Sequence, residues 1–460
     1  MMRKIRIALA SLFMIAITAL FIDFTGSVHA YLGWCAKIQL VPAILASSGA
    51  AVCIILFTLL FGRIYCSVVC PLGIFQDLFS RKKFSYRPPR KALIILRYAL
   101  LAAFPFTGLL TLLEPYSAYG RIASQLLGPI YLWGNNLLAY FAERMDSYAF
   151  YSVEVWLKGG GVLAIAILTF LAVGISAWKT GRGYCNAVCP VGAFLGLLAK
   201  FSVVKVRINK EKCTNCGICA KNCKASCIDS SKKEIDYLRC VNCFTCMAVC
   251  PKNAVKYKWE ESPSQTRQTS QGDVKSRRSF LIGGALLAAT AAANQFDGGL
   301  MKLESKKSPE RSRPIIPPGA DNFRSFHNHC TGCQLCTTVC SNQVLRPHKA
   351  TKPTMSFERG YCRPECVKCS QVCPSGAIRP ITAAEKSSIQ IGCAVWKSDL
   401  CVNDCDLCIR KCPTNAVQRV GSQIVIAEER CIGCGACEHL CPSRPHSAIY
   451  VEGFEAHRVV

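Results

Sequence analysis

The sequence predicts a multidomain protein: an α-helical membrane bundle of four spans plus a signal or anchor helix, joined to small α+β modules of the bacterial-ferredoxin type. Two observations lead to this fold class. Hydrophobic residues make up 51% of the 460 residues, and most of their long uninterrupted runs lie in the first 200, which indicates a membrane section. Of the 32 cysteines, 24 fall into six groups of four with gaps of two or three residues, which is the spacing of metal ligands and not of a small disulfide scaffold.

The formal net charge of +27 would ordinarily suggest a nucleic-acid partner. Many of the basic residues flank the apolar runs, however, as the positive-inside rule requires. Iron–sulfur clusters held by thiolates are also anionic, so six clusters at roughly −2 each would cancel about 12 of these charges. We therefore predict no nucleic-acid partner.

Residues 1–200 form the predicted membrane domain. Loop 63–91 carries seven Lys/Arg and one acidic residue, whereas loop 114–160 carries three and four, so the first loop is predicted to be cytoplasmic and the second periplasmic. The chain would then be a multi-pass protein of a bacterial cytoplasmic (inner) membrane. Within the second loop, the half-apolar stretch 122–141 is expected to lie along the membrane surface. The four predicted spans are residues 7–22, 38–62, 92–113 and 159–178.

A motif of the form Gly-Arg-x-Tyr-Cys-x-x-x-Cys-Pro follows the second and the fourth span. Its cysteines are Cys66 and Cys70 in the first copy and Cys185 and Cys189 in the second. Cysteines four residues apart share one face of a helix, so two copies related by a pseudo-twofold axis would present four thiols to one shared site. That site is predicted to hold a seventh [4Fe-4S] cluster or to work as redox-active disulfides; the alternative is a packing motif with unreactive thiols.

Residues 201–260 are predicted to be a cytoplasmic two-cluster ferredoxin module, because Cys-x2-Cys-x2-Cys-x3-Cys occurs twice in them. In this run the fourth cysteine of each motif ligates the other cluster, whereas zinc modules use two separated Cys-x2-Cys pairs. Lys224 follows the first motif where a Pro is usual, and Cys227 comes soon after, so Cys227 is an alternative to Cys223 as the remote ligand. The predicted ligands are Cys213, Cys216, Cys219 and Cys223 in the first motif and Cys240, Cys243, Cys246 and Cys250 in the second.

Residues 261–320 are predicted to connect two halves of the chain. Arg277 and Arg278, followed by the uncharged run 279–296, resemble a twin-arginine export signal. The run has about 18 residues, just enough to span a bilayer, so it is either a fifth span or a signal cleaved near Ala293. A basic linker followed by an ordinary buried helix is the alternative reading.

Residues 321–460 are predicted to be an exported domain with four further clusters, which brings the total to six [4Fe-4S] clusters. Few residues remain between the motifs to build a core, so the clusters themselves are expected to hold this domain together. The predicted ligands are Cys330, Cys333, Cys336, Cys340, Cys362, Cys366, Cys369, Cys373, Cys401, Cys405, Cys408, Cys412, Cys431, Cys434, Cys437 and Cys441. The cysteines outside all these groups are Cys35, Cys53, Cys227 and Cys393.

These motifs resemble a known pair of proteins. Residues 1–260, with four spans, two Cys-x3-Cys-Pro motifs and a two-cluster module, look like the NapH family. Residues 276–460, with the paired arginines, a Pro-Pro-Gly-Ala stretch at 317–320 and four motifs, look like the NapG family. The membrane part is also similar to polyferredoxins of the NosR and CcoG type, from the maturation of nitrous-oxide reductase and cytochrome oxidase. By resemblance to four-cluster subunits, the first exported motif would pair with the fourth and the second with the third.

The resemblance to NapH and NapG implies an electron-transfer subunit of the quinol-dehydrogenase type, as in periplasmic nitrate reductase systems. Such a subunit would take electrons from quinol of the membrane quinone pool and pass them through [4Fe-4S] clusters to a periplasmic reductase. It would have no terminal reductase site and no catalytic residues of its own. Two alternatives remain open: a conduit fed by a cytoplasmic donor, and a redox maturation factor that delivers electrons to a metal centre during its assembly.

Overall fold

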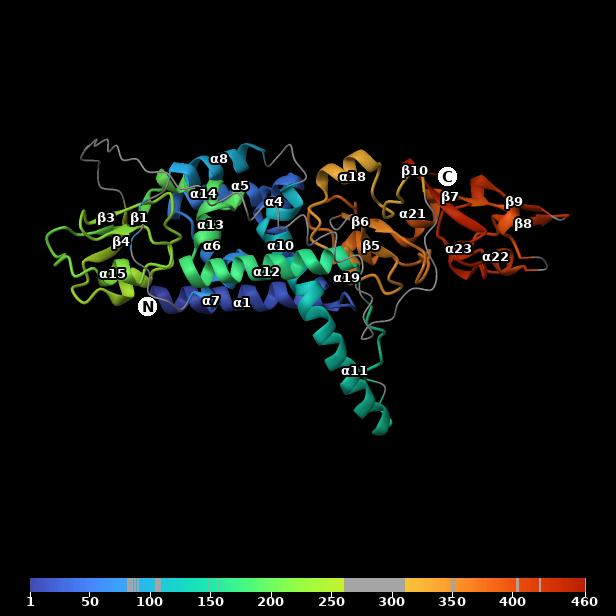
Figure 1. Ribbon diagram of the computed structural model, residues 1–460, viewed down its shortest axis with the longest axis horizontal. Helices are drawn as coiled ribbons and strands as arrows, with labels where there is room; N and C mark the ends of the chain where they lie inside the picture. The colour runs from blue at the N-terminus through green and yellow to red at the C-terminus, as the bar shows by residue number, and fades with distance from the viewer. Residues whose placement is uncertain are drawn as a thin grey trace.

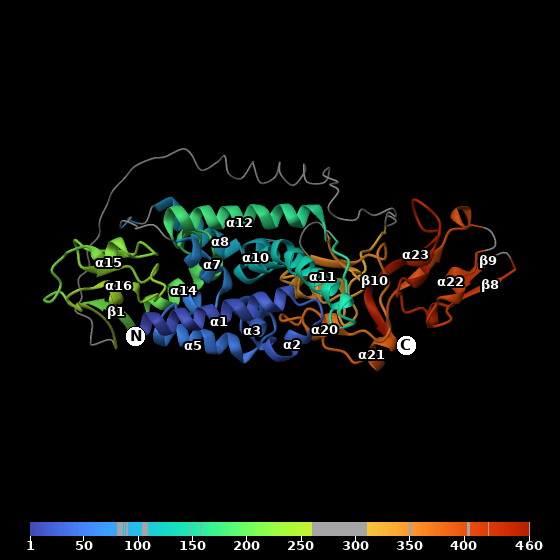
Figure 2. The same ribbon diagram turned by 90° about the horizontal axis from the view of Figure 1, so that it is seen from below.

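The computed structural model describes residues 1–80, 86, 88, 91–103, 109–147, 149–156, 158–259, 311–348, 352–402, 405–421 and 423–459. The molecule is elongated, with the helical section of residues 1–200 in its middle (Figure 1). A first module, 204–259, lies at one end of this section. A second module, 311–388, and a third module, 389–459, follow one another at the other end, and the perpendicular view gives the same order (Figure 2). The predicted twin-arginine segment, with Arg277 and Arg278, lies outside the described residues.

Two long helices, α1 (Met2–Ile22) and α12 (Gly160–Thr180), run along the long axis of the molecule (Figure 2). Each has 21 residues, and their mean hydropathies of 2.4 and 2.3 make both apolar enough to cross a membrane. The other helices of this section are α2 (Ser27–Leu32), α3 (Trp34–Lys37), α4 (Leu40–Leu45), α5 (Gly49–Phe61), α6 (Tyr65–Val68), α7 (Pro71–Phe79), α8 (Lys91–Ala103), α9 (Leu109–Leu113), α10 (Pro115–Ile122), α11 (Gly128–Arg144), α13 (Gly183–Ala187) and α14 (Pro190–Lys200).

The second predicted span, residues 38–62, is not a single helix but is divided into α4 and α5. Ser47 adopts a left-handed φ of 50°. The N–H of Ser48 donates to the carbonyl oxygen of Ala43 over 3.0 Å, which is the Schellman arrangement that ends a helix. An unbroken apolar composition therefore did not specify an unbroken helix here.

The third predicted span, residues 92–113, is represented by α8 and α9, and residues 104–108 between them are outside the described residues. Among the described residues, two helices are long and apolar enough to span a membrane, rather than the four that were predicted. The predicted first and fourth spans are these two helices. The other helices that the structure describes in this section are shorter, with at most 17 residues.

The predicted surface stretch 122–141 forms the end of α10, a π-helical turn (Ala123–Leu127) and most of α11. Helix α11 leaves the helical section at an angle, close to the second module (Figure 1). Its apolar side chains include Trp133, Leu137 and Phe141, which are 46%, 59% and 55% exposed. That this helix lies on a membrane surface stays a prediction.

The first module has the strand order expected of a two-cluster ferredoxin. Its outer strands, β1 (Val204–Ile208) and β4 (Val255–Trp259), pair antiparallel. An inner hairpin of β2 (Ile228–Asp229) and β3 (Glu234–Ile235) separates the two cysteine motifs. Short helices carry the middle of each motif: α15 (Ile218–Lys221) and α16 (Thr245–Val249).

The second and third modules divide what was predicted as one four-cluster domain. Each has an inner hairpin between its two motifs, β5–β6 in the second module and β8–β9 in the third, and the third also has an outer antiparallel pair, β7–β10. The elements are α18 (Phe323–His329), α19 (Leu335–Thr338), β5 (Leu345–His348), β6 (Lys352–Met355), α20 (Lys368–Gln371), α21 (Ala383–Ser388), β7 (Ile389–Trp396), α22 (Leu407–Arg410), β8 (Val417–Val420), β9 (Gln423–Ile426), α23 (Ala436–Leu440) and β10 (Ile449–Val459), with 3₁₀ turns at Ser398–Leu400 and Glu428–Arg430.

Asp77 joins the helical section to the first module. Its carboxylate lies 2.6 Å from Arg6 of α1, 2.9 Å from Arg182 beside the second Cys-x3-Cys motif and 3.5 Å from Lys224 of the first module. The side chains of Arg6, Asp77 and Arg182 are all at most 9% exposed. A buried carboxylate with several cationic partners is well compensated, so this cluster fixes the module against the helices.

Candidate iron–sulfur sites

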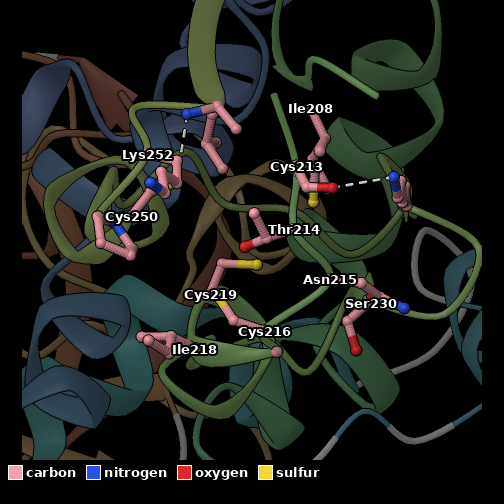
Figure 3. A pocket seen from close by; sticks show the side chains of 15 residues that line it. Ile208, Cys213, Thr214, Asn215, Cys216, Ile218, Cys219, Ser230, Cys250 and Lys252 are labelled. Carbon is pink, nitrogen blue, oxygen red and sulfur yellow. Dashed lines mark hydrogen bonds between the residues drawn. The ribbon is translucent and has the colours of Figure 1, made fainter. Parts of the chain in front are cut away.

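The first site, site A, is formed by Cys213, Cys216, Cys219 and Cys250. Cys213 and Cys216 lie on one loop, Cys219 lies on the short helix α15 that follows it, and Cys250 arrives from the end of the second motif (Figure 3). The four line a cavity of about 20 Å³. Asn215 and Gly217 have φ values of 55° and 69°, and such left-handed residues turn the loop so that its cysteines face inward. The structure thus brings together the four cysteines that the exchange of fourth ligands predicts.

Site B, in the same module, is formed by Cys223, Cys227, Cys240, Cys243 and Cys246, which line a cavity of about 20 Å³. The sulfurs of Cys223 and Cys227 are 3.4 Å apart. A hydrogen bond from Cys227 lowers the pKa of Cys223 to about 7. Both candidates for the remote ligand therefore face the same cavity, and the site has one thiol more than a cluster needs.

Site C and site D belong to the second module. Cys340 joins Cys362, Cys366 and Cys369 around a cavity of about 30 Å³, which is site D. Cys373 faces the first three cysteines of the module. Burial and, after it, the charge of Cys373 raise the pKa of Cys330 to about 12. Site C consists of Cys330, Cys333, Cys336 and Cys373.

Site E and site F belong to the third module. Cys441 joins Cys401, Cys405 and Cys408 around a cavity of about 20 Å³, which is site F. Burial raises the pKa of Cys434 to about 12, and Cys412 is the first of the cysteines that add to this effect. Site E consists of Cys412, Cys431, Cys434 and Cys437.

The predicted pairing of these motifs is wrong. The expectation was that the first C-terminal motif pairs with the fourth and the second with the third. In the structure, the first motif exchanges its fourth cysteine with the second, and the third with the fourth. The physical reason is the inner hairpin of each module, because it folds two consecutive motifs against one another.

The four cysteines of the Cys-x3-Cys-Pro motifs meet inside the helical section, and we call this the four-thiol site. Cys66, Cys70, Cys185 and Cys189 are 3%, 3%, 4% and 3% exposed. The four side chains lie close enough for a charge on one of them to affect the others. The sulfur of Cys185 accepts from the side chain of Gln76 over 3.1 Å, and that of Cys189 accepts from the N–H of Gly192 over 3.3 Å.

Two arginines cross between the halves of this site. Arg182 of the second copy donates to the carbonyl oxygen of Cys66 over 2.7 Å, and a Cβ on Gly73 of the first copy would overlap that arginine and that carbonyl. The second copy mirrors this contact, since a Cβ on Gly192 would overlap the carbonyl oxygen of Cys185 and press on Arg63. Both arginines have no exposed surface. The repeat predicted from the sequence is therefore a pseudo-twofold unit.

The chemistry of these residues fits [4Fe-4S] clusters. Such clusters are held by four Cys thiolates and carry negative charge, and the cavities of sites A, B, D and F leave space between the thiols. Among the described residues, no three His, Cys, Asp or Glu side chains close on the position of a single metal ion. At the four-thiol site, the fully buried guanidinium group of Arg63 lies 3.9 Å from the sulfur of Cys66, a cationic neighbour that suits an anionic cluster.

Two cysteines outside the quartets also lie at these sites: Cys227, which the sequence named as an alternative remote ligand, and Cys393, whose position the sequence did not indicate. Cys227 lies in site B, and Cys393 hydrogen-bonds Cys431 of site E and lowers the pKa of that thiol to about 6. The departure from Pro at Lys224 was the signal for Cys227. For Cys393 the sequence holds no such signal, because Cys393 lies on β7, 38 residues before Cys431.

Comparison with family models agrees with these sites. A model described as a 4Fe-4S binding domain matches residues 44–88 and 162–209, one match for each Cys-x3-Cys-Pro motif. Two other models with the same description match residues 240–254 and 424–444. Iron–sulfur binding domains are thus present in the helical section, the first module and the third module.

The chain is also similar to several ferredoxin-type proteins. It is 32% identical to the methylamine utilization ferredoxin-type protein MauN of Methylorubrum extorquens over 191 residues, 40% of this chain and 55% of that protein. It is 26% identical to the ferredoxin-type protein NapH of Escherichia coli over 222 residues, 46% of this chain and 67% of that protein. It spans about half the length of MauN.

The alignment with a third relative covers most of that relative's length. The ferredoxin-type protein NapF of Escherichia coli is 30% identical over 154 residues, 32% of this chain and 89% of NapF. The resemblance of residues 276–460 to the NapG family stays a prediction. With its 4Fe-4S binding domains and these relatives, the chain belongs to the family of ferredoxin-type electron-transport proteins that includes NapF and NapH.

Proposed function

We propose that this protein takes electrons from quinol in the bacterial cytoplasmic membrane and passes them to a periplasmic reductase. The observation that carries the proposal is the position of the four-thiol site. It lies in the helical section, between sites A and B at one end of the molecule and sites C to F at the other (Figure 1). A line of redox centres along one axis is what transport across a bilayer requires.

The two long helices support a transmembrane orientation. Because α1 and α12 run along the long axis, a bilayer crossed by both would leave the first module on one face and the second and third modules on the other. The excess of basic residues in loop 63–91 favours the cytoplasm for the first module. The periplasm is then the side of sites C to F, as the predicted export of residues 321–460 requires.

A continuous path connects the four-thiol site to site C. Tyr184, next to Cys185, donates to the carbonyl oxygen of Leu113 over 3.3 Å. Glu114 follows and caps α10, accepting from the N–H of Tyr116 over 3.0 Å. At the far end of α10, a Cβ on Gly120 would lie 2.7 Å from the carbonyl oxygen of Cys333. Helix α10 has 8 residues, so it covers only about 12 Å at 1.5 Å per residue.

Several residues along this path have polar or ionisable side chains, whose burial costs free energy. Glu114 and Arg121 are 1% and 0% exposed, and Tyr116 is 0% exposed. Ionisable residues inside a membrane section are expensive and usually serve function. Their position between two cysteine sites is the reason to expect a redox role for the four-thiol site, as a seventh cluster or as redox-active thiols, and not a packing role.

The relatives suggest which kind of partner this chain has. NapH and NapF are named as ferredoxin-type proteins, and we extend to this chain a role beside a reductase of the Nap kind. The four sites of the second and third modules would deliver electrons to that partner. The chain itself supplies no terminal reductase site in this proposal.

Reduction by a quinol tests the proposal. The full chain, purified without oxygen and placed in lipid nanodiscs, should lose the visible absorbance of its oxidised clusters when menadiol is added. The loss should extend to the clusters of the second and third modules, which electron paramagnetic resonance can follow. A chain that is reduced by dithionite but not by menadiol would contradict a quinol donor.

A second function is favoured by site A. It lies in the module farthest from sites C to F (Figure 1), and Cys216 is exposed there, so a soluble cytoplasmic donor could reach it. Reduction of the chain by reduced ferredoxin, under conditions where menadiol has no effect, would support this second function over the first.

A further inference from the structure

A large cavity opens in the side of the helical section, between α8 and α12. Its volume is about 890 Å³, which lies in the range of sites that enclose a small organic molecule, roughly 300–1,000 Å³. Its walls include Leu93 and Ile94 of α8 and Ile165, Leu168 and Ala172 of α12. Leu93 and Ile94 are 44% and 39% exposed, so the cavity is bordered by apolar side chains that face outward from the helices.

The cavity is long and has one polar end. Along α12 its wall extends from Ile165 to Thr180, which is about 22 Å at 1.5 Å per residue. Near the first module it is lined by Ser226, Asp236 and Arg239. Asp236 and Arg239 form an ion pair of 2.6 Å. An elongated molecule with one polar end and an apolar tail matches this gradient.

The walls are also built from the direct neighbours of two cysteine sites. Tyr184 and Val188 flank Cys185 and Cys189 of the four-thiol site, and both line the cavity. From the other side come the residues between Cys223 and Cys227 and the residues just before Cys240, all of site B; those that line the cavity are Ala225, Ser226, Leu238 and Arg239. A molecule in this cavity would therefore lie beside two redox sites at once.

We infer that this cavity binds the ring of a membrane quinol, with its polar substituents toward Asp236 and its tail along α12. The inference rests on the proposed function and gives it a location. Arg97 and Arg239 line the cavity together with Asp236, so a phospholipid phosphate is the competing occupant, and the displacement experiment below separates the two. A quinol ring carries hydroxyl groups that donate to such a carboxylate and no charge of its own.

The balance of the reaction fits two neighbouring acceptors. Oxidation of one hydroquinone to the quinone releases two electrons and two protons. An iron–sulfur cluster accepts one electron at a time, so site B and the four-thiol site, loaded with a cluster, would each take one. The protons would leave toward water at the polar end of the cavity, where Asp236 is 26% exposed.

Filling the cavity tests the inference. Ala172 lines the cavity on α12 and is itself exposed, and Leu171 beside it is 47% exposed and does not line the cavity. We would titrate the full chain in nanodiscs with 2-heptyl-4-hydroxyquinoline N-oxide, a fluorescent analogue of the quinol ring, and follow the quenching of its fluorescence. Ala172→Trp should weaken binding about tenfold or more because the new ring occupies the space, whereas Leu171→Trp should bind as the unaltered chain does.

Two controls keep the outcomes apart. The iron content and the reduction by dithionite should be the same in both variants, which shows that they fold and load their clusters. Unchanged binding and menadiol reduction in Ala172→Trp, or displacement of the analogue by phospholipid, would overturn this location while the proposed function stands. No binding and no menadiol reduction in the unaltered chain would overturn the proposed function together with the inference.

Discussion

The backbone N–H of Cys362 donates a hydrogen bond to the carbonyl oxygen of Cys434 over 2.9 Å. Cys362 belongs to site D of the second module and Cys434 to site E of the third. Two cluster ligands from different modules are thus in direct contact. The four C-terminal sites therefore form one continuous series, in which sites D and E connect the modules.

The pairing of the motifs can be tested by counting iron. Cys330 and Cys373 lie in one site, so substituting both by Ala should remove about four iron atoms, no more than either change alone. Cys441 belongs to a different site, so Cys330→Ala with Cys441→Ala should remove about eight. The reverse result would restore the pairing of the first motif with the fourth that the sequence predicted.

That the first three cysteines of each motif face one site could be predicted, because they lie within seven or eight residues of one another in the sequence. The partner of each loop could not. It depends on which two loops a hairpin folds together, and the short strands β5, β6, β8 and β9 have no clear signal among so many cysteines. Resemblance to other four-cluster subunits therefore gave the wrong pairs.

In the membrane section, too, some features could be predicted from the sequence and others could not. The two spans that the structure shows as single helices have no interruption in their sequence pattern. The second predicted span also looked continuous, but Ser47 and Ser48 end a helix inside it. The large cavity beside α12 could not be predicted at all, since it arises from segments far apart in the chain: residues 88–113, 165–188 and 225–239.

We expect about 24 iron atoms in each fully loaded chain, four for each of the six ferredoxin-type sites, and about 28 if the four-thiol site also holds a cluster. Anaerobic purification followed by elemental analysis for iron and zinc gives the number. A value near eight, or zinc in a fixed ratio to protein, would contradict the assignment of six clusters.

The four-thiol site should act as one unit. Cys66→Ser or Cys185→Ser should leave the iron of the six ferredoxin-type sites in place and abolish the reduction of the second and third modules by menadiol. The double variant should be no worse than either single variant, because residues that act as a unit are not additive. Cys53→Ser is the matched control, since Cys53 is exposed and lies outside all cysteine groups. Full menadiol activity in both single variants would make these cysteines packing residues.

Translocation of the C-terminal half should depend on Arg277 and Arg278. Exchange of both for Lys keeps the charge but removes the guanidinium groups that a twin-arginine signal presents. A reporter that is active only in the periplasm, fused after Val460, should then become silent. Exchange of Lys306 and Lys307 for Arg is the control and should leave the reporter active. Undiminished reporter activity in the first variant would indicate another route of insertion.

Lys158 should raise the reduction potentials of sites C and D. Its Nζ atom donates to Thr338 over 3.3 Å, and Thr338 stands between Cys336 of site C and Cys340 of site D. Coulomb's law at an effective dielectric constant of about 20 gives on the order of 1.5 kcal/mol for a unit charge at ~10 Å, which is about 60 mV for one electron. Lys158→Met should therefore lower the potentials of both sites, each by about that amount. Lys158→Arg, which keeps the charge, should leave both nearly unchanged. Redox titration followed by electron paramagnetic resonance measures both, and equal potentials in the Met variant and the unaltered chain would show that this lysine is screened from the clusters.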